Sequence, residues 1–359
     1  MPASDAAAGA RRFLAAPRPE EWFALGYAAL VALLLAAFGL PISIAPMARE
    51  YGRFLLAMLA FALPLWLVAL GIRAARGRFD RSVALRDLGG LARALPALLV
   101  TLIAYTNLKS RIAQLHPTLY DAALERIDAT IHFAGGDFVG WLLGFTHEPA
   151  ASRLWSYVYF YAWAALALPF GLAFARAGAT AARRLVAALI LTYAAGSLLY
   201  LAFPSLGPAF AFRPRFEHLH GTLGFDVQGS MLAAYLRLLR DPHATAVPFF
   251  GIAAMPSLHL ATTALGLFAA WRWFRPMLLV LVPWNLAIAW SALYFGWHYA
   301  VDFYVGVMLA WGAWAVGGRL GRESRAATLS TTPMAEVADG PTRPTPSAVD
   351  AGNGFGTTD

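Results

Sequence analysis

The chain has 359 residues, of which 59% are hydrophobic and 13% are charged. Soluble globular proteins carry about 45–50% apolar and about 25% charged residues, so this composition excludes a soluble globular protein and predicts a polytopic membrane protein. The absence of cysteine excludes disulfide scaffolds, thiolate metal sites and cysteine nucleophiles. The net charge of +8 does not indicate a nucleic-acid partner, because most basic residues lie in short loops between apolar stretches, where they set membrane topology.

Eight apolar stretches are candidates for membrane-spanning helices. A bilayer core about 30 Å thick needs roughly 20 apolar residues per helix. The predicted spans are 22–44, 54–72, 95–108, 154–175, 185–203, 256–274, 277–295 and 298–316. We interpret the first as an uncleaved helix, because it is long enough to span and lacks a clear cleavage site. The predicted fold class is all-α, a polytopic membrane bundle of about eight transmembrane helices.

The distribution of Lys and Arg predicts the orientation of this bundle. When the loops are assigned alternately to the two sides, most of the 28 basic residues fall on one side, which places both termini in the cytoplasm. The opposite side then holds two long segments, 109–153 and 204–255. Within them, 118–133 and 231–240 have the apolar periodicity of amphipathic helices. From residue 318 onward the composition predicts a disordered tail.

Two short stretches place ionisable residues at the ends of predicted spans, where charge is costly and needs a reason. Pro256 suits the first turn of the sixth span, which puts His259 in that turn. His298 and Asp302 lie four residues apart on one face of the eighth span, so Asp302 can accept a hydrogen bond from one ring nitrogen and aim the other away. Both spans enter from the same side, so the two histidines are predicted at one depth, beside helix N-termini that attract phosphate.

This arrangement predicts phosphoryl transfer, in which one imidazole attacks phosphorus and the other protonates the leaving oxygen. Two other interpretations stay open from the residues alone. The histidines could serve only helix packing, or two His and one Asp could hold zinc with an open position. His218, His220 and His243 form a weaker cluster that is expected to be solvated.

The stretches 256–259 and 291–302 resemble the second and third signature motifs of the type-2 phosphatidic acid phosphatase superfamily. Within it, the chain most closely resembles the inositol phosphorylceramide synthase branch. General lipid phosphatases usually read Pro-Ser-Gly-His and begin the third motif with Ser-Arg, whereas this chain has Leu258 and Ala292. In the first motif Lys109 and Pro117 match, but His116 stands where the superfamily has Arg. The resemblance covers about residues 105–316.

The resemblance implies that His298 is the nucleophile, that a phosphohistidine forms, and that Asp302 orients the ring. His259 would donate a proton to the departing alcohol and then take one from the acceptor, a lipid hydroxyl or water. The expected phosphate-binding residues are Lys109, Arg111 (in place of the missing guanidinium) and Ser257. The resemblance implies no metal and no organic cofactor, with phospholipid and lipid-alcohol substrates taken from the bilayer.

These observations together predict four regions along the chain. They are a cytoplasmic N-terminal segment (1–21), two extra transmembrane helices with a cytoplasmic loop (22–93), a six-helix catalytic domain (94–317) and a cytoplasmic tail (318–359). The expected location is a bacterial inner membrane, with the active site facing the periplasm. The sequence leaves the oligomeric state open.

The first functional hypothesis is transfer of phosphoinositol, or a similar headgroup, to a lipid alcohol such as ceramide. The alternative is a lipid phosphate phosphatase that uses water as acceptor. A rival of another class is a transporter or flippase, which should show broken helices or buried charge in mid-span. Here the charges lie at the span ends, which disfavours that rival.

Overall fold

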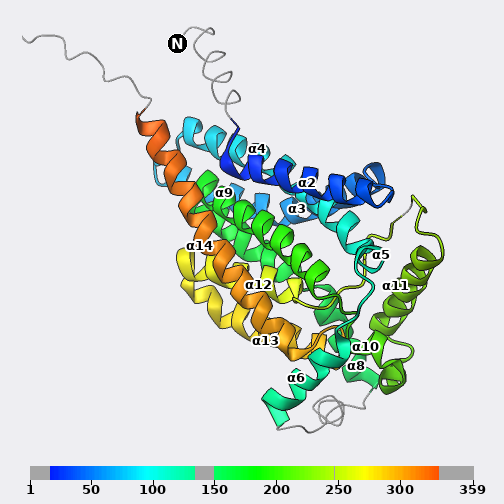
Figure 1. Ribbon diagram of the computed structural model, residues 1–359. Helices are drawn as coiled ribbons and strands as arrows, with labels where there is room; N and C mark the ends of the chain where they lie inside the picture. The colour runs from blue at the N-terminus through cyan, green and yellow to red at the C-terminus, as the bar shows by residue number, and fades with distance from the viewer. Residues whose placement is uncertain (1–16, 134–148, 246, 331–359) are drawn as a thin grey trace, which may run out of the picture.

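The computed structural model of the protein describes residues 17–133, 149–245 and 247–330. Within these ranges the backbone forms helices and turns and no strand, which confirms the all-α fold class. Helical stretches long and apolar enough to cross a membrane are Pro19–Ala37 (α2), Ala45–Ala75 (α3), Arg81–Ser110 (α4), Ala164–Ala202 (α9), Arg275–Tyr294 (η2 and α13) and Ala300–Leu320 in α14. The chain therefore has the architecture of a polytopic membrane bundle (Figure 1).

The helix α9 combines the predicted fourth and fifth spans. Gly178 inside it has a non-helical backbone, with φ of 53° and ψ of −135°. A Cβ on Gly196 would meet Leu258 at 2.6 Å, and a Cβ on Gly266 would meet the carbonyl of Ala165 at 2.6 Å. These contacts place residues 165 and 196 of α9 beside residues 266 and 258 of α12, which are only roughly 12 Å apart. On a straight helix, residues 165 and 196 would be roughly 46 Å apart. The two halves of α9 therefore fold back on each other at Gly178.

The sixth predicted span is found as α12, Leu258–Trp273, which has 16 residues. This length gives roughly 24 Å of helix, somewhat less than a bilayer core of about 30 Å. Even so, α12 lies inside the bundle, packed against α9, α13 and α14. Ser257 caps its first turn by accepting a hydrogen bond from the Leu260 N–H.

Several predicted boundaries differ from the structure. The fourth span, for example, is divided between α8, which ends at Phe160, and α9, which begins at Ala164. The third span is not confined to 95–108, because α4 runs from Arg81 to Ser110. The helix α14 runs from Ala300 to Ser330, so it continues past residue 318, where the composition predicted the tail to begin. The segment after 318 is rich in Arg, Leu, Glu and Ala, which favour helix. Residues 1–16 and 331–359 lie outside the described part of the chain.

Shorter helices gather at one end of the bundle. They are α5 (Ile112–Leu115), α6 (Asp121–Phe133), α8 (Pro149–Phe160), α10 (Pro208–Ala211), η1 (Arg213–Leu219) and α11 (Leu223–Arg240). Of these, α6, α8, α10 and α11 lie at the end opposite to the start of α2 (Figure 1). The two predicted amphipathic stretches are present in α6 and α11.

Partly buried ion pairs connect helices at the other end of the bundle. Arg183 of α9 pairs with Glu20 at 2.6 Å, and Arg93 of α4 pairs with Glu21 at 2.6 Å. Both acidic residues lie in the first turn of α2, where a helix N-terminus favours negative charge. The N-terminal helix is thereby attached to the bundle through α4 and α9.

Candidate active site

The structure brings His298 and Asp302 together at the start of α14. His298 Nδ1 lies 3.3 Å from Asp302 Oδ2 and 2.9 Å from the carbonyl oxygen of Ala254. Both partners accept, so Nδ1 carries the proton and Nε2 keeps its lone pair. Asp302 is fully buried, and its Oδ2 also accepts from the Tyr299 N–H at 2.9 Å. The pair has the geometry of an oriented nucleophile.

His259 faces His298 from the first turn of α12. The two ring centroids are 6.2 Å apart, a separation that leaves room for an atom between them. The hydroxyl of Tyr159 lies 2.9 Å from His259 Nδ1, so Nε2 is the ring nitrogen left for a ligand. The Tyr159 ring stacks on Trp297 at 5.2 Å and 4°. Tyr159, which fixes this ring, was not anticipated from the sequence.

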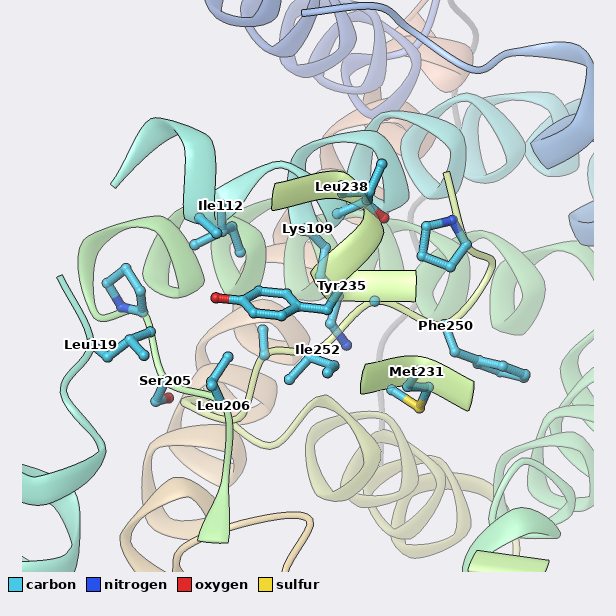
Figure 2. A pocket seen from close by; sticks show the side chains of 16 residues that line it. Lys109, Ile112, Leu119, Ser205, Leu206, Met231, Tyr235, Leu238, Phe250 and Ile252 are labelled. Carbon is cyan, nitrogen blue, oxygen red and sulfur yellow. The ribbon is translucent and has the colours of Figure 1, made fainter. Parts of the chain in front are cut away.

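Both histidines line a cavity of about 430 Å³, a volume typical of ligand sites. Lys109 lines it too, and its ammonium group lies 5.2 Å from the ring centroid of Tyr200. On another side of Lys109 is a pocket of about 20 Å³, enough for a water molecule. Figure 2 shows this pocket, with Lys109 among Tyr235, Met231 and Ile252. Lys109 thus lies between the large cavity and a water-sized one.

Two of the expected phosphate-binding side chains are hydrogen-bonded to the protein backbone. Arg111 is fully buried and donates to the carbonyl oxygens of Pro242, at 2.6 Å, and of Ala244, so it fastens the loop after α11 and does not line the cavity. The Ser257 hydroxyl caps α12 through the Leu260 N–H. The expectation that Arg111 replaces the missing guanidinium therefore disagrees with its position in the fold.

The amphipathic helix α6 positions the catalytic region. Asp128 accepts from the N–H groups of Ala300, at 2.6 Å, and Val301, at 2.8 Å, and so caps α14 from another helix. Burial raises the pKa of the Asp128 carboxyl, against the opposing effect of these two donors. His132 Nε2 lies 2.8 Å from the Tyr304 hydroxyl on α14. A packing role alone does not describe α6, because its polar side chains hold the helix that begins beside His298.

Asp121, at the start of α6, connects two loops around the site. Its carboxylate accepts from the Tyr299 hydroxyl at 2.9 Å and from the Gly207 N–H at 2.8 Å. Gly207 has a φ of 99°, and a Cβ there would meet the Trp297 carbonyl at 2.6 Å, so only glycine fits. These contacts give a role to the stretches around Asp121 and 203–208 that sequence reasoning could not assign.

Of the residues that the structure describes, no three His, Asp or Glu side chains lie together in a way that could hold a metal ion. Apart from tyrosines, the described titratable side chains that line the cavity are the imidazoles of His259 and His298 and the ammonium group of Lys109.

A comparison with protein families shows the family to which the chain belongs. The model of the PAP2 superfamily matches residues 122–316, more than half of the chain. The chain belongs to the PAP2 superfamily. No curated protein and no solved structure matches it. The match includes His259, His298 and Asp302 and begins after Lys109.

Membership of the PAP2 superfamily, together with the long apolar helices, makes the chain an integral multi-pass membrane enzyme. Its activity is of the lipid phosphatase or phosphotransferase type, which the first functional hypothesis and its alternative share. The transporter or flippase rival is not supported. The match is to the superfamily as a whole and not to its inositol phosphorylceramide synthase branch. The reaction and the roles of individual residues are therefore proposals.

Proposed function

We propose that the enzyme transfers a phosphorylated headgroup from a phospholipid to a lipid alcohol, with phosphoinositol as the headgroup and ceramide as the acceptor in the first test. His298 is the nucleophile, Asp302 orients it, His259 is the acid and base, and Lys109 binds phosphate. The observation that carries this proposal is the charge of the cavity.

Among the described residues that line the cavity, Lys109 is the one Lys or Arg. General lipid phosphatases of the superfamily, by the motifs given above, bring two further Arg residues. Here His116 donates toward the backbone, with Nδ1 2.8 Å from the Leu201 carbonyl, and Ala292 is buried in an apolar cluster. A phosphate monoester carries about −1.5 to −2 charges at neutral pH, whereas a phosphodiester carries one. A single Lys beside two imidazoles therefore favours a phosphodiester donor.

The reaction then has two displacement steps. In the first, Nε2 of His298 attacks phosphorus, the bond from phosphorus to the glycerol oxygen breaks, and protonated His259 gives its proton to that oxygen. Diacylglycerol leaves, and the headgroup phosphate stays on His298. In the second step His259 takes the proton of the acceptor hydroxyl, whose oxygen attacks phosphorus and releases His298.

Hydrolysis is the second candidate, and one observation favours it. The pocket of about 20 Å³ adjoins Lys109 and can hold water, so water has a place close to the cavity that the lipid would occupy. In that case water replaces the lipid alcohol in the second step, and every catalytic residue keeps its role.

Purified full-length protein in detergent separates these candidates. Headgroup-labelled phosphatidylinositol and labelled phosphatidic acid are each supplied with and without ceramide. A labelled sphingolipid that requires ceramide supports transfer. Inorganic phosphate released from phosphatidic acid, at a rate above phosphatidylinositol turnover, overturns transfer in favour of the phosphatase. The His298→Ala variant serves as the blank in every arm.

A further inference from the structure

The cavity does not end at the two histidines but extends along the bundle. Its lining runs from Lys109 to Leu95 on α4 and from Tyr200 to Val186 on α9. In each case the two residues are fourteen positions apart, which is roughly 21 Å of helix. This depth exceeds half of a bilayer core of about 30 Å.

Away from the histidines the cavity wall is aliphatic and aromatic, with Leu98, Leu102, Leu166, Phe170 and Leu189 along it. The hydroxyls of Thr262 and Thr263, which also line it, are already donated to backbone carbonyls of their own helix. No described lining residue beyond Lys109 and the histidines offers a charge or a titrating imidazole. This part of the cavity therefore fits a hydrocarbon chain and not a polar headgroup.

One wall of this apolar part comes from α3. Its lining residues repeat at the spacing of a single helix face: Tyr51, Phe54, Leu55, Met58 and Leu59. This helix precedes residue 122, where the superfamily match begins. The wall is therefore built by a part of the chain that the shared domain does not supply.

Contacts at the end of α3 near the histidines hold this face in place. The Tyr51 hydroxyl is hydrogen-bonded to Thr106 of α4, and its ring lies 4.9 Å from that of Phe249. Phe54 lies 6.4 Å from Trp163, ring to ring. The stripe is thus fixed against both the Lys109 helix and the loop before α12.

A role as a simple membrane anchor does not account for this geometry. The opposite face of α3 exposes Leu56 and Leu67, as expected for a face turned to lipid. An anchor would pack its other face against the bundle, because protein interiors are close-packed with few voids larger than a water molecule. Instead that face borders a volume of about 430 Å³ that reaches His259 and His298.

We propose that α3 is part of the substrate site: its stripe of Tyr51, Phe54, Leu55, Met58 and Leu59 binds a hydrocarbon chain of the lipid whose phosphate lies between the two histidines. The inference rests on the proposed function for the position of that phosphate. It assigns selectivity for chain length to a helix outside the shared domain.

A matched pair of variants tests this selectivity. Leu59→Trp fills the far part of the stripe, and Leu56→Trp places the same side chain on the lipid-facing side of α3. With Leu59→Trp, kcat/KM for dioleoyl phosphatidylinositol should fall about tenfold or more, because the indole takes up space that the end of an oleoyl chain would fill. Turnover of the dioctanoyl lipid should stay within about twofold, as should both substrates with Leu56→Trp.

A substitution that enlarges the cavity distinguishes a change in chain selectivity from a loss of folding. Met58→Ala removes bulk at an open wall, so the protein should stay folded and the ratio of rates should shift toward longer or bulkier chains. Wild-type chain preference in both Leu59→Trp and Met58→Ala, with thermal unfolding unchanged, overturns the inference.

A binding experiment separates this inference from the proposed function. Phosphatidylinositol with a photoactivatable diazirine near the end of one chain is cross-linked to the full-length protein, and the labelled residues are mapped. The inference is supported if the α3 stripe is labelled and if this labelling is reduced by unlabelled lipid and by Leu59→Trp but not by Leu56→Trp. Such labelling without phospholipid turnover would overturn only the proposed function. Turnover with labelling confined to Leu56 and its face would sink only the inference.

Discussion

At the scale of single residues, the ring of His298 is held by two acceptors. Its Nδ1 is closer to the Ala254 carbonyl, at 2.9 Å, than to the Asp302 carboxylate, at 3.3 Å. The backbone carbonyl alone can keep the proton on Nδ1, since a carbonyl oxygen only accepts. In the proposed mechanism Asp302 therefore shares the orienting task, and its carboxylate also stabilises the positive charge that develops on the ring when Nε2 bonds to phosphorus.

This shared orientation sets the expected effect of Asp302→Asn. Removing the carboxylate of a Ser-His-Asp triad lowers kcat about 10⁴-fold because the wrong tautomer is favoured. Here the Ala254 carbonyl preserves the tautomer, so we expect kcat of Asp302→Asn to fall about 10²–10³-fold. The fall in kcat for His298→Ala, which removes the nucleophile, should be at least as large. Steady-state kcat in detergent is the measurement. Full activity of the Asn variant would exclude the orienting role of Asp302.

Tyr159 provides the second prediction at this scale. Tyr159→Phe keeps the ring on Trp297 but removes the hydroxyl that lies 2.9 Å from His259 Nδ1. We expect kcat to fall roughly 10-fold to 100-fold, less than the roughly 10²–10⁴-fold that an acid–base group contributes, because His259 stays in place and loses only its orienting partner. KM and thermal unfolding should change little. Tyr157→Phe, an exposed tyrosine on the same helix α8, is the control. Equal kcat in both variants would show that the hydroxyl does not position His259.

The sequence predicted His298 and Asp302 as neighbours from a helical spacing of four. The two side chains do meet, but α14 begins only at Ala300, so His298 lies in the turn before the helix and Asp302 reaches it from the first turn. The sequence also predicted that His259 would meet them, since alternating spans put two helix N-termini on one side. Tyr159 could not be found in this way: it is 100 residues from His259 and belongs to no motif. Arg111 was misplaced for the reverse reason, because proximity to Lys109 in sequence does not say which way a guanidinium turns.

At the scale of elements, α6 holds α14 through a cap supplied from outside that helix. Asp128→Ala leaves the N–H groups of Ala300 and Val301 without their acceptor, at a cost of about 1–3 kcal/mol for buried donors. We expect a lower melting temperature and a fall in kcat, since the first turn of α14 carries Asp302. Thr130→Ala, on the exposed side of α6, should change neither. Unaltered stability of Asp128→Ala would mean that α6 is not needed to begin α14.

The turn at Gly178 determines whether α9 can form its two antiparallel halves. Gly178 has a φ of 53°, and a Cβ there would lie 1.9 Å from Asp87 Oδ1, the atom that accepts from the Ala179 N–H at 2.8 Å. Gly178→Ala should therefore destabilise the protein by more than the roughly 1–2 kcal/mol of the left-handed backbone alone. Gly26→Ala in α2, where nothing lies within 4 Å, is the control. Equal melting temperatures for both variants would contradict this account of the turn.

Hydrophobic periodicity predicted the separate fourth and fifth spans, but not their connection. Gly178 lies in a stretch rich in Ala and Arg that reads as a helix, and only the contact with Asp87 of α4 shows why the chain reverses there. Similarly, the periodicity of 118–133 predicted an amphipathic helix but no partners for its acidic residues. Their partners are backbone N–H groups of α14, and a backbone donor leaves no signature in sequence.

At the scale of the whole molecule, α6, α8, α10 and α11 lie at one end of the bundle, and α2 begins at the other end (Figure 1). His259 is hydrogen-bonded to Tyr159 of α8 and lies 6.2 Å from His298, ring to ring, so the two histidines belong to the α8 end. The bias of basic residues predicts that the α2 end faces the cytoplasm. The active site would then face the periplasm of a bacterial inner membrane. This orientation decides which leaflet supplies the substrate, because the phosphate is proposed to lie at the histidine end of the cavity.

The absence of cysteine allows a clean test of this orientation. Single cysteines are introduced at two exposed positions, His220→Cys between η1 and α11 and Arg78→Cys between α3 and α4. In intact spheroplasts a membrane-impermeant maleimide should label His220→Cys, since that turn lies at the histidine end, whereas Arg78→Cys should react only after permeabilisation. Both variants must retain turnover. The reverse labelling pattern would place the histidines in the cytoplasm and assign the substrate to the inner leaflet.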